Sequence, residues 1–541
     1  MTDSAPMTGF TASRRLQAAV LALVCAIFFG NALFGGFVWD DNLFYANQVY
    51  WKFDLRTILF GLANGLEYQP ARDLTYLWDV LVWRGSPWGF HLTNLLLFIA
   101  VTLLVQRLAA ALYSRFIKSG QASLVPFITA LLFAAHPLRS EVVAWVTQRN
   151  TLLATLFFLV AAIFFLRWQA EKRGLLLTFS CICFSLALLS KATVVVLPLL
   201  LVLLLLFRKE REPGVPAAWL ALLPFAVIAA AGAALHLTIA SRTTVIAATY
   251  FGSIRERLAV ALQIPFFYLK QTLLPTDISA FYADGFSRSL ASPGSLAAAL
   301  AMVVILSVCW ALRQRLPELA LGFGWFIITL LPVSNLFATS PVIADRYLFL
   351  PAVGLAFVIA VLMERLLQGN GKLLCVAAVV VLPLGVMTVS QNRVWHDDIS
   401  LWRATASRSP QVAGVWFNLG RALHKTPQLS MTLEAYLRAV KLDPADTRAL
   451  DNAASLFPST RGTIRERHEL VRSLAEQLPD YPAGLPQIGN TGLEWRHPDA
   501  AEELFLYLLA ADPQSVHLRL AMANFYRKMG APDRAAAILR Q

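Results

Sequence analysis

The stretch RRLQAAVLALVCAIFFGNALF, residues 14–34, decides the class of this fold. Two arginines precede an apolar run that continues without a charged residue to Phe34. A run of about 20 predominantly apolar residues is long enough to cross a bilayer as a helix. The basic flank and apolar core also resemble a signal peptide, but the run lacks a convincing small-residue cleavage site and further apolar runs follow. We therefore predict a retained signal anchor.

The composition extends this prediction to the rest of the chain. Of its 541 residues, 57% are hydrophobic and 15% are charged, and the mean hydropathy is +0.59. Soluble globular proteins carry about 25% charged residues. We predict an all-α, polytopic membrane protein with about eleven transmembrane helices. The predicted spans are 15–36, 92–113, 122–136, 151–167, 174–189, 192–207, 216–239, 294–312, 317–335, 346–366 and 372–391.

Short basic clusters between the apolar runs indicate the orientation. Examples are RKER at 208–211 and RQR at 313–315. Lys and Arg concentrate on the cytoplasmic side of membrane proteins, and these clusters share one side if the N-terminus is cytoplasmic. An odd number of spans then places everything after residue 392 on the opposite face. Despite a net charge of +13, the clusters are too short and scattered for a nucleic-acid surface, and we expect no nucleic-acid partner.

One apolar segment, RERLAVALQIPFFYLKQTLLP at 255–275, fits a membrane span poorly. It contains Gln263, Lys270 and two prolines. Counting it as a span would also move the later basic cluster to the outer side. We predict a re-entrant or interfacial helix here.

The sequence after residue 392 becomes amphipathic and contains a repeat. SRSP, KLDP, QLPD and AADP place prolines at 410, 444, 479 and 513, which are spaced by 34, 35 and 34 residues. A period of 34 residues is typical of tetratricopeptide (TPR) helix pairs, although a generic helical bundle with coincidental prolines is the alternative. The small and large residues of the pattern are Trp416, Leu419, Gly420, Tyr436, Ala439, Ala501, Phe505, Ala523, Tyr526 and Ala535. We predict a C-terminal TPR α-solenoid.

Two adjacent acids, Asp40 and Asp41, follow the first apolar run. Charged residues at the edge of a bilayer are costly and are usually functional or paired. A helix cap beginning at Asn42 would explain one acid but not both, so capping and catalysis both remain open. A second pair, Asp397–Asp398, precedes the amphipathic tail and is explained by helix capping, so an acid pair alone proves nothing.

Six further ionisable residues are predicted on the same outer face: His136, Arg139, Glu141, Arg149, Lys191 and Arg346. Each also has a purely structural explanation. Residues 136–150 can be a self-satisfied polar loop between two spans, Lys191 can extend to lipid headgroups, and Arg346 can pair with Asp345. His136 and Glu141 lack a third metal ligand, so we predict no metal site.

No nucleotide-binding, metalloprotease or serine-hydrolase motif occurs in a credible context. The outer acids and bases suit chemistry on a lipid-linked anionic substrate, with a carboxylate as general base and cations that stabilise a departing phosphate. A transporter would more often show inverted repeats, which we do not find. A non-catalytic structural scaffold is the third class of function that the sequence allows.

These motifs together resemble the transmembrane and tetratricopeptide-repeat-containing O-mannosyltransferases and their bacterial homologues, which have the GT-C glycosyltransferase fold. The similar stretches occur in the family's order and cover most of residues 30–440. They are FVWDDNLFYANQ, YQPARDLTYLWD, GFHLTNLLLF, HPLRSEVVAWVTQRNTLLATLFFL, LLSKATVVVLPL, YLKQTLLPTDISAFY, GWFIITLLPVSNL, ADRYLFLPAVGL and VWHDDISLW.

The resemblance implies an inverting transferase with a polyprenyl-phosphate sugar donor, and Asp40 or Asp41 as the catalytic carboxylate. It implies that the donor phosphate is held by Arg139, Arg149, Lys191 and Arg346. His136 and Glu141 match the family's outer-loop motif without an assigned role. The chain departs from the family at YQP, where YRP is expected, and Arg72 is the candidate substitute. Nothing in the sequence requires a cofactor.

We predict a GT-C-like membrane domain over 1–391 and an extracytoplasmic TPR domain over 392–541. The expected function is transfer of a sugar such as mannose from polyprenyl phosphate to a hydroxyl, and the expected acceptors are Ser or Thr of a protein recruited by the repeats. The alternatives are a lipid or surface-polysaccharide glycosyltransferase and a non-catalytic scaffold for envelope assembly. The chain contains no Asn-x-Ser/Thr sequon, which favours a bacterial inner membrane with a periplasmic tail over an endoplasmic reticulum protein.

Overall fold

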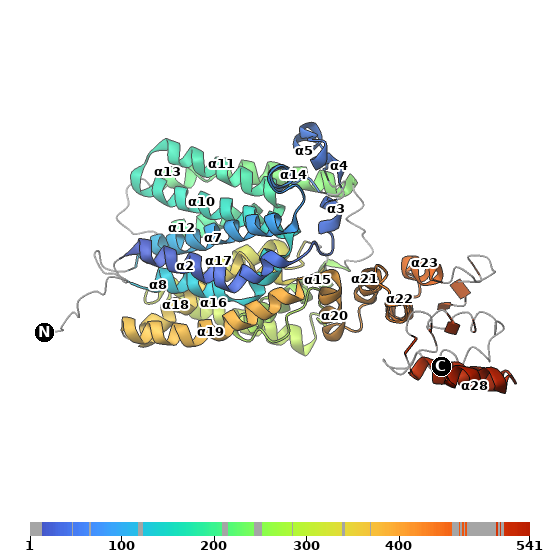
Figure 1. The fold of residues 1–541 in the computed structure, drawn as a ribbon. Coiled ribbons are helices and arrows are strands. Elements are labelled where there is room, and N and C mark those ends of the chain that lie inside the picture. Colours follow the sequence, from blue (N-terminus) through green and yellow to red (C-terminus); the bar gives the residue numbers. More distant parts are fainter. Residues whose placement is uncertain are drawn as a thin grey trace. The chain divides into compact units, whose positions relative to one another are not determined.

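The computed structural model describes most of the chain. The described residues are 13–45, 47–63, 67–116, 123–207, 215–242, 252–283, 285–337, 341–367, 369–456, 513–514 and 516–540, with isolated positions from 465 to 509. They form helices and turns and no strand (Figure 1). The chain divides into two compact units: Met1–Ala280 with Asp284–Asp397, and Phe281–Ala283 with Asp398–Gln541.

The first unit is a bundle of long helices with several short ones at its end (Figure 1). Its helices are α2 (Arg14–Phe29), α3 (Asp41–Tyr45), α4 (Gln48–Trp51), α5 (Leu55–Phe60), α6 (Pro70–Trp83), α7 (Pro87–Tyr113), α8 (Val125–Ala135), α9 (Ser140–Ala144), α10 (Arg149–Glu171), α11 (Gly174–Ser190), α12 (Leu197–Leu206), α13 (Val215–Leu220), α14 (Leu223–Arg242), α15 (Ile254–Leu273), α16 (Pro293–Leu312), α17 (Pro317–Leu330), α18 (Pro351–Leu367) and α19 (Asn370–Val394). Short 3₁₀ turns join some of them, including η1 (Gly30–Phe34), η2 (Pro137–Arg139), η3 (Val146–Gln148) and η7 (Asp345–Leu348).

Six helices within the described ranges are long and apolar enough to cross a membrane, or seven if a bent pair is one span. The bent pair joins Val125–Ala135 to Pro137–Ala144 at 65°. Three shorter apolar helices cover 174–190, 192–206 and 317–333. The predicted count of eleven spans is therefore not confirmed, because several of the apolar runs in the described ranges form helices of fewer than 18 residues. The segment predicted not to span forms α15, which does not qualify as a span, with Pro265 inside it.

The centre of this unit is α8, whose sequence VPFITALLFAA is apolar all round. A helix without a polar face has no side to present to water, and every described position of α8 except Pro126 is buried. Nearby, α17 and α18 approach closely through glycines. A Cβ atom added at Gly322 would lie 2.9 Å from the carbonyl oxygen of Gly354. Small residues let two membrane helices come this near to each other.

The polar segment 136–150 differs from the predicted outer loop, because every one of its residues is buried. It forms η2, α9 and η3 and returns the chain from α8 to α10. Its polar groups find partners inside the protein: Ser140 donates to the carbonyl of Thr388 at 3.4 Å, and Thr388 donates to the carbonyl of Ala135 at 2.7 Å. The segment is therefore part of the core rather than a solvated connection.

The second unit consists of shorter amphipathic helices. They are α20 (Asp398–Arg408), α21 (Ala413–Leu423), α22 (Leu429–Leu442), α23 (Thr447–Ser455), α27 (Val516–Lys528) and α28 (Pro532–Arg540). Helices α21 and α22 form a pair in which Gly420 lies against Tyr436; a Cβ atom at Gly420 would lie 2.5 Å from Cδ1 of that ring. Helix α20 begins at Asp398, so this acid lies in its first turn, and the capping role of the second acid pair stays a prediction.

The predicted repeat pattern is covered unevenly by the described residues. Ala523, Tyr526 and Ala535 belong to one buried cluster with Phe505. Ala501 and most of the second and third predicted repeats lie outside the described residues. The structure therefore contains helix pairs of the predicted kind at both ends of the tail, and the continuous solenoid stays a prediction.

Candidate functional site

Polar residues from several segments meet at one end of the first unit. Asp40 and Asp41 follow η1, and both bond to the segment that leads from α9 into α10. Lys191, directly after α11, reaches the first turn of α10. Arg346, in η7 before α18, pairs with Glu141 of α9. Residues separated by more than 300 positions in the sequence, such as Asp40 and Arg346, thus belong to one polar site, because the ends of successive helices alternate between the two ends of the bundle.

Asp41 is fully engaged by hydrogen bonds. Its side chain is 1% exposed. Its Oδ1 accepts from the backbone N–H of Thr147 at 2.7 Å and from the Thr147 hydroxyl at 2.6 Å, and its Oδ2 accepts from the N–H of Val38 at 3.1 Å. Burial, and then the neighbouring charge of Asp40, raise the pKa of Asp41 to about 8. Asp41 therefore ties the first loop to the segment before α10.

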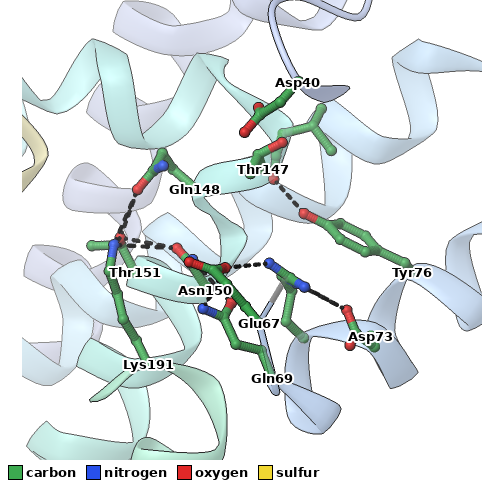
Figure 2. A network of polar contacts seen from close by, with 12 residues as sticks. Asp40, Glu67, Gln69, Asp73, Tyr76, Thr147, Gln148, Asn150, Thr151 and Lys191 are labelled. Carbon is green, nitrogen blue, oxygen red and sulfur yellow. Dashed lines mark hydrogen bonds and ion pairs between the residues drawn. The ribbon is translucent and has the colours of Figure 1, made fainter. Parts of the chain in front are cut away.

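Asp40 is only half-buried and points toward the polar network (Figure 2). Its Oδ1 accepts from the indole N–H of Trp145 at 3.0 Å. Burial raises the pKa of Asp40, while its hydrogen bonds and the charge of Arg346 act in the opposite direction. A carboxylate that is accessible, oriented and more basic than usual has the properties of a general base.

Lys191 is held by neutral oxygens. Its Nζ donates to Thr151 Oγ1 at 2.7 Å, to Gln148 Oε1 at 3.2 Å and to Asn150 Oδ1 at 3.4 Å (Figure 2). None of these partners carries a charge, so the positive charge of the ammonium is not neutralised by its cradle. Lys191, Thr151 and Arg346 line the same cavity. Such a cavity suits an anion.

Arg346 is fixed by Glu141. Its guanidinium NH1 lies 2.5 Å from Glu141 Oε1, and its backbone N–H donates to Oε2 at 2.7 Å. Its Cζ also lies 5.5 Å from the ring centroid of Trp145. Burial opposes the charge of Arg346, but Glu141 outweighs this effect and raises its pKa. Trp145 therefore contacts both Asp40 and the cation that lines the cavity.

Arg149 lies in a buried ion pair outside the cavity that Lys191 and Arg346 line. Its NH1 lies 2.5 Å from Asp79 Oδ2, its Nε donates to Asn94 Oδ1 at 2.8 Å, and its NH2 donates to the carbonyl of Phe90 at 2.8 Å. Both members of the ion pair are 0% exposed. The side chain thus joins α10 to α6 and α7, and it does not line the cavity of Lys191.

Arg139 and His136 are also buried within the protein. Arg139 donates to the carbonyl of Leu348 at 3.3 Å, and its Cζ lies 5.1 and 5.4 Å from the ring centroids of two phenylalanines. His136 contacts the carbonyl of Thr272 through Nε2 at 3.0 Å and accepts from the N–H of Leu138 through Nδ1. Both ring nitrogens are therefore used. Among the described residues, no three His, Cys, Asp or Glu side chains are grouped so as to hold a metal ion.

Arg72 lies in α6 and is buried. It pairs with Asp73 at 2.9 Å and contacts Glu67 at 3.5 Å. Glu67 accepts from Gln69 at 2.8 Å, and Gln69 accepts from Asn150 at 3.1 Å. A chain of side chains thus links Arg72 to the Lys191 cradle without placing its guanidinium in the cavity.

The sequence interpretation missed five partners that this geometry identifies: Trp145, Thr147, Gln148, Asn150 and Thr151. They stand together in WVTQRNT, at the entry to the apolar run of α10. A concentration of polar residues directly before an apolar run was the available signal. What it could not reveal is that these side chains face inward.

No family model matches the chain. It is 24% identical to the protein O-mannosyl-transferase F38B6.6 of Caenorhabditis elegans over 387 residues, which cover 70% of this chain and 54% of that protein. It is 24% identical to Tmtc3 of Drosophila melanogaster over 488 residues (75% and 52%) and 23% identical to human TMTC3 over 514 residues (85% and 55%), both of which are named protein O-mannosyl-transferases.

The similarity extends through both units of the chain, since the human match covers 85% of it. The chain spans about half the length of the curated relatives it matches. The predicted resemblance is confirmed: this chain is related, over most of its length, to the family of TMTC protein O-mannosyl-transferases.

Proposed function

We propose that this protein is an integral-membrane glycosyltransferase that moves a hexose such as mannose from a polyprenyl-phosphate donor to a hydroxyl of a protein acceptor. The observation that carries the proposal is the arrangement of Asp40, Lys191 and Arg346. Lys191 and Arg346 line one cavity, and Trp145 links Arg346 to the half-buried carboxylate of Asp40 by contacting both side chains. The names of the relatives support the choice of sugar transfer to protein.

The two acids have different roles in this proposal. Asp40 accepts the proton of the acceptor hydroxyl while the hydroxyl oxygen forms a bond to the anomeric carbon. Asp41 already accepts three hydrogen bonds from Val38 and Thr147, so it positions the loop rather than reacting. A positioned general base typically contributes about 10²- to 10⁴-fold to a rate.

The cations act on the leaving group. As the bond between the anomeric carbon and the phosphate oxygen breaks, the electron pair stays with the phosphate, and Lys191 and Arg346 stabilise the added negative charge. Base and cations on opposite sides of the sugar lead to inversion. Arg139 and Arg149 contribute to the fold that holds this cavity, because each is buried against other protein groups.

We further propose that the site faces the extracytoplasmic side, with a cytoplasmic N-terminus, in a bacterial inner membrane. The basic clusters between the predicted spans support this orientation. The tail then shares the compartment of the site, and its TPR-like helix pairs recruit the protein acceptor along an extended surface.

The test uses the full chain in lipid nanodiscs with radiolabelled mannosyl-phosphoryl-polyprenol and a library of Ser/Thr-containing peptides. The wild type transfers label to peptide, and Asp40→Asn lowers the rate about 10²- to 10⁴-fold. Asp397→Asn, from the second acid pair, is the matched control and keeps the wild-type rate. Transfer by Asp40→Asn at the wild-type rate refutes Asp40 as the base. Label that enters only the lipid fraction refutes the protein acceptor.

A further inference from the structure

Three tryptophans from distant parts of the first unit form a stack beside Asp40. The rings of Trp39 and Trp145 lie 4.7 Å apart with an interplanar angle of 4°, and those of Trp145 and Trp395 lie 5.4 Å apart at 20°. Trp145 is in the middle and is 3% exposed. Trp39 has a φ of +56°, a left-handed conformation that residues other than glycine rarely adopt. Such strain persists only where the surrounding structure fixes it, and it clusters at functional sites.

The end of α19 holds the loop that carries Trp39 and Asp40. The N–H of Gly36 donates to the carbonyl of His396 at 2.8 Å. One turn earlier, the Asn392 amide donates to the carbonyl of Phe28 and to Asn31 Oδ1, both at 2.8 Å. The segment that supplies the outer tryptophan of the stack therefore also anchors the first loop. The indole of Trp145 is held from both faces by elements that are tied to each other.

We infer that Trp145 is a positioning residue for the catalytic carboxylate: its indole N–H fixes the Oδ1 oxygen of Asp40, and the stack fixes the indole. This inference rests on the proposed role of Asp40 as the base. With Oδ1 held by Trp145, we assign Oδ2 to the proton of the acceptor hydroxyl. An indole carries one donor and no acceptor, so it selects the ionised carboxylate, which can only accept.

The contribution of this hydrogen bond can be measured through the pKa of Asp40, which also depends on the charged groups around it. Asp41 lies next to it in the chain, and Arg346 and Glu67 act on it from η7 and from the segment before α6. Burial raises the pKa of Asp40, the hydrogen bonds from Thr147 and Trp145 and the charge of Arg346 lower it, and the charge of Glu67 raises it. Removing the indole N–H therefore raises the pKa of Asp40. The base is then protonated over a wider acidic range, and the activity loss is largest at low pH.

The experiment measures the pH dependence of kcat/KM for mannose transfer by the full chain in nanodiscs. In Trp145→Phe, the acid limb moves upward by about one pH unit, as expected when a hydrogen bond to a charged group is lost. A second variant carries benzothienylalanine at position 145, in which sulfur replaces the indole N–H while ring size and stacking are kept. It shows the same shift even if Trp145→Phe folds poorly. Trp310→Phe, on the exposed face of α16, is the matched tryptophan control and leaves the profile unchanged.

The outcomes separate this inference from the proposed function. If the benzothienylalanine variant folds and its acid limb coincides with that of the wild type, Trp145 does not position the base and the inference is wrong. If Asp40→Asn keeps its activity, the proposed function fails first. A uniform loss of activity at every pH, without movement of the acid limb, also overturns the inference because it indicates a purely structural role.

Discussion

Replacing Arg149 tests whether this arginine holds the fold or the donor. In the structure, its guanidinium lies 2.5 Å from Asp79, donates to Asn94 and to the carbonyl of Phe90 at 2.8 Å, and is 0% exposed. Arg149→Met keeps much of the stem but leaves the Asp79 carboxylate buried without its cation. Breaking a buried pair in this way costs about 3–5 kcal/mol, so we expect that loss in the free energy of unfolding.

The same helix offers a matched control. Arg167 forms an exposed pair with Glu171 one turn away, at 3.0 Å. Exposed pairs of this kind contribute about 0.3–0.5 kcal/mol, so Arg167→Met is expected to change stability by no more than that. The double variant Asp79→Asn with Arg149→Met removes both charges and is expected to recover part of the loss.

The assay is equilibrium unfolding of the full chain in mixed micelles with increasing sodium dodecyl sulfate, followed by tryptophan fluorescence. Donor affinity is measured in parallel, with polyprenyl phosphate as the ligand. A structural role of Arg149 predicts a large difference in stability between Arg149→Met and Arg167→Met. It is refuted if the two variants unfold alike while Arg149→Met alone loses affinity for polyprenyl phosphate, because Arg149 would then hold the donor.

Two further predictions concern the cavity and the repeats. Burial, and then the charge of Arg346, lower the pKa of Lys191 to about 7, so the side chain is a charged ammonium below that pH and a neutral amine above it. The affinity for polyprenyl phosphate should therefore fall as the pH rises from about 6 to 8. Lys191→Arg should remove this pH dependence, because arginine stays charged. Gly420→Val forces a side chain into the ring of Tyr436 and should destabilise the second unit by about 1–3 kcal/mol, measured by limited proteolysis, whereas Gly414→Val, which has open space at its Cβ, should have little effect.

Much of the architecture could be predicted because it depends on local patterns. Apolar runs predict membrane helices, and the spacing of prolines predicted helix pairs in the tail, of which α21 with α22 is one. The number of spans could not be predicted in the same way. Whether a run becomes one long helix or two shorter ones depends on breaks such as the 65° bend after Ala135, and hydropathy alone does not reveal such bends.

The candidate site was predicted as a set of residues and not as a geometry. Lys191 and Arg346 line one cavity and Trp145 links Arg346 to Asp40, whereas Arg149 and Arg139 are engaged elsewhere. All five are charged residues near the ends of apolar runs, so the sequence offered no means to separate them. The distinction lies in their partners, which come from distant parts of the chain.

The sequence by itself determined the membrane class, the helical composition, the position of the acid pair and the relationship to a family, since each follows from residue types and their order. Only the tertiary structure decided which acid stays partly accessible. Asp41 is buried and accepts two hydrogen bonds at one oxygen from Thr147, more than 100 positions away, whereas Asp40 is half-buried and accepts from the indole of Trp145. Burial and hydrogen bonding are properties of neighbours in space, and two adjacent residues of one type differ only through them.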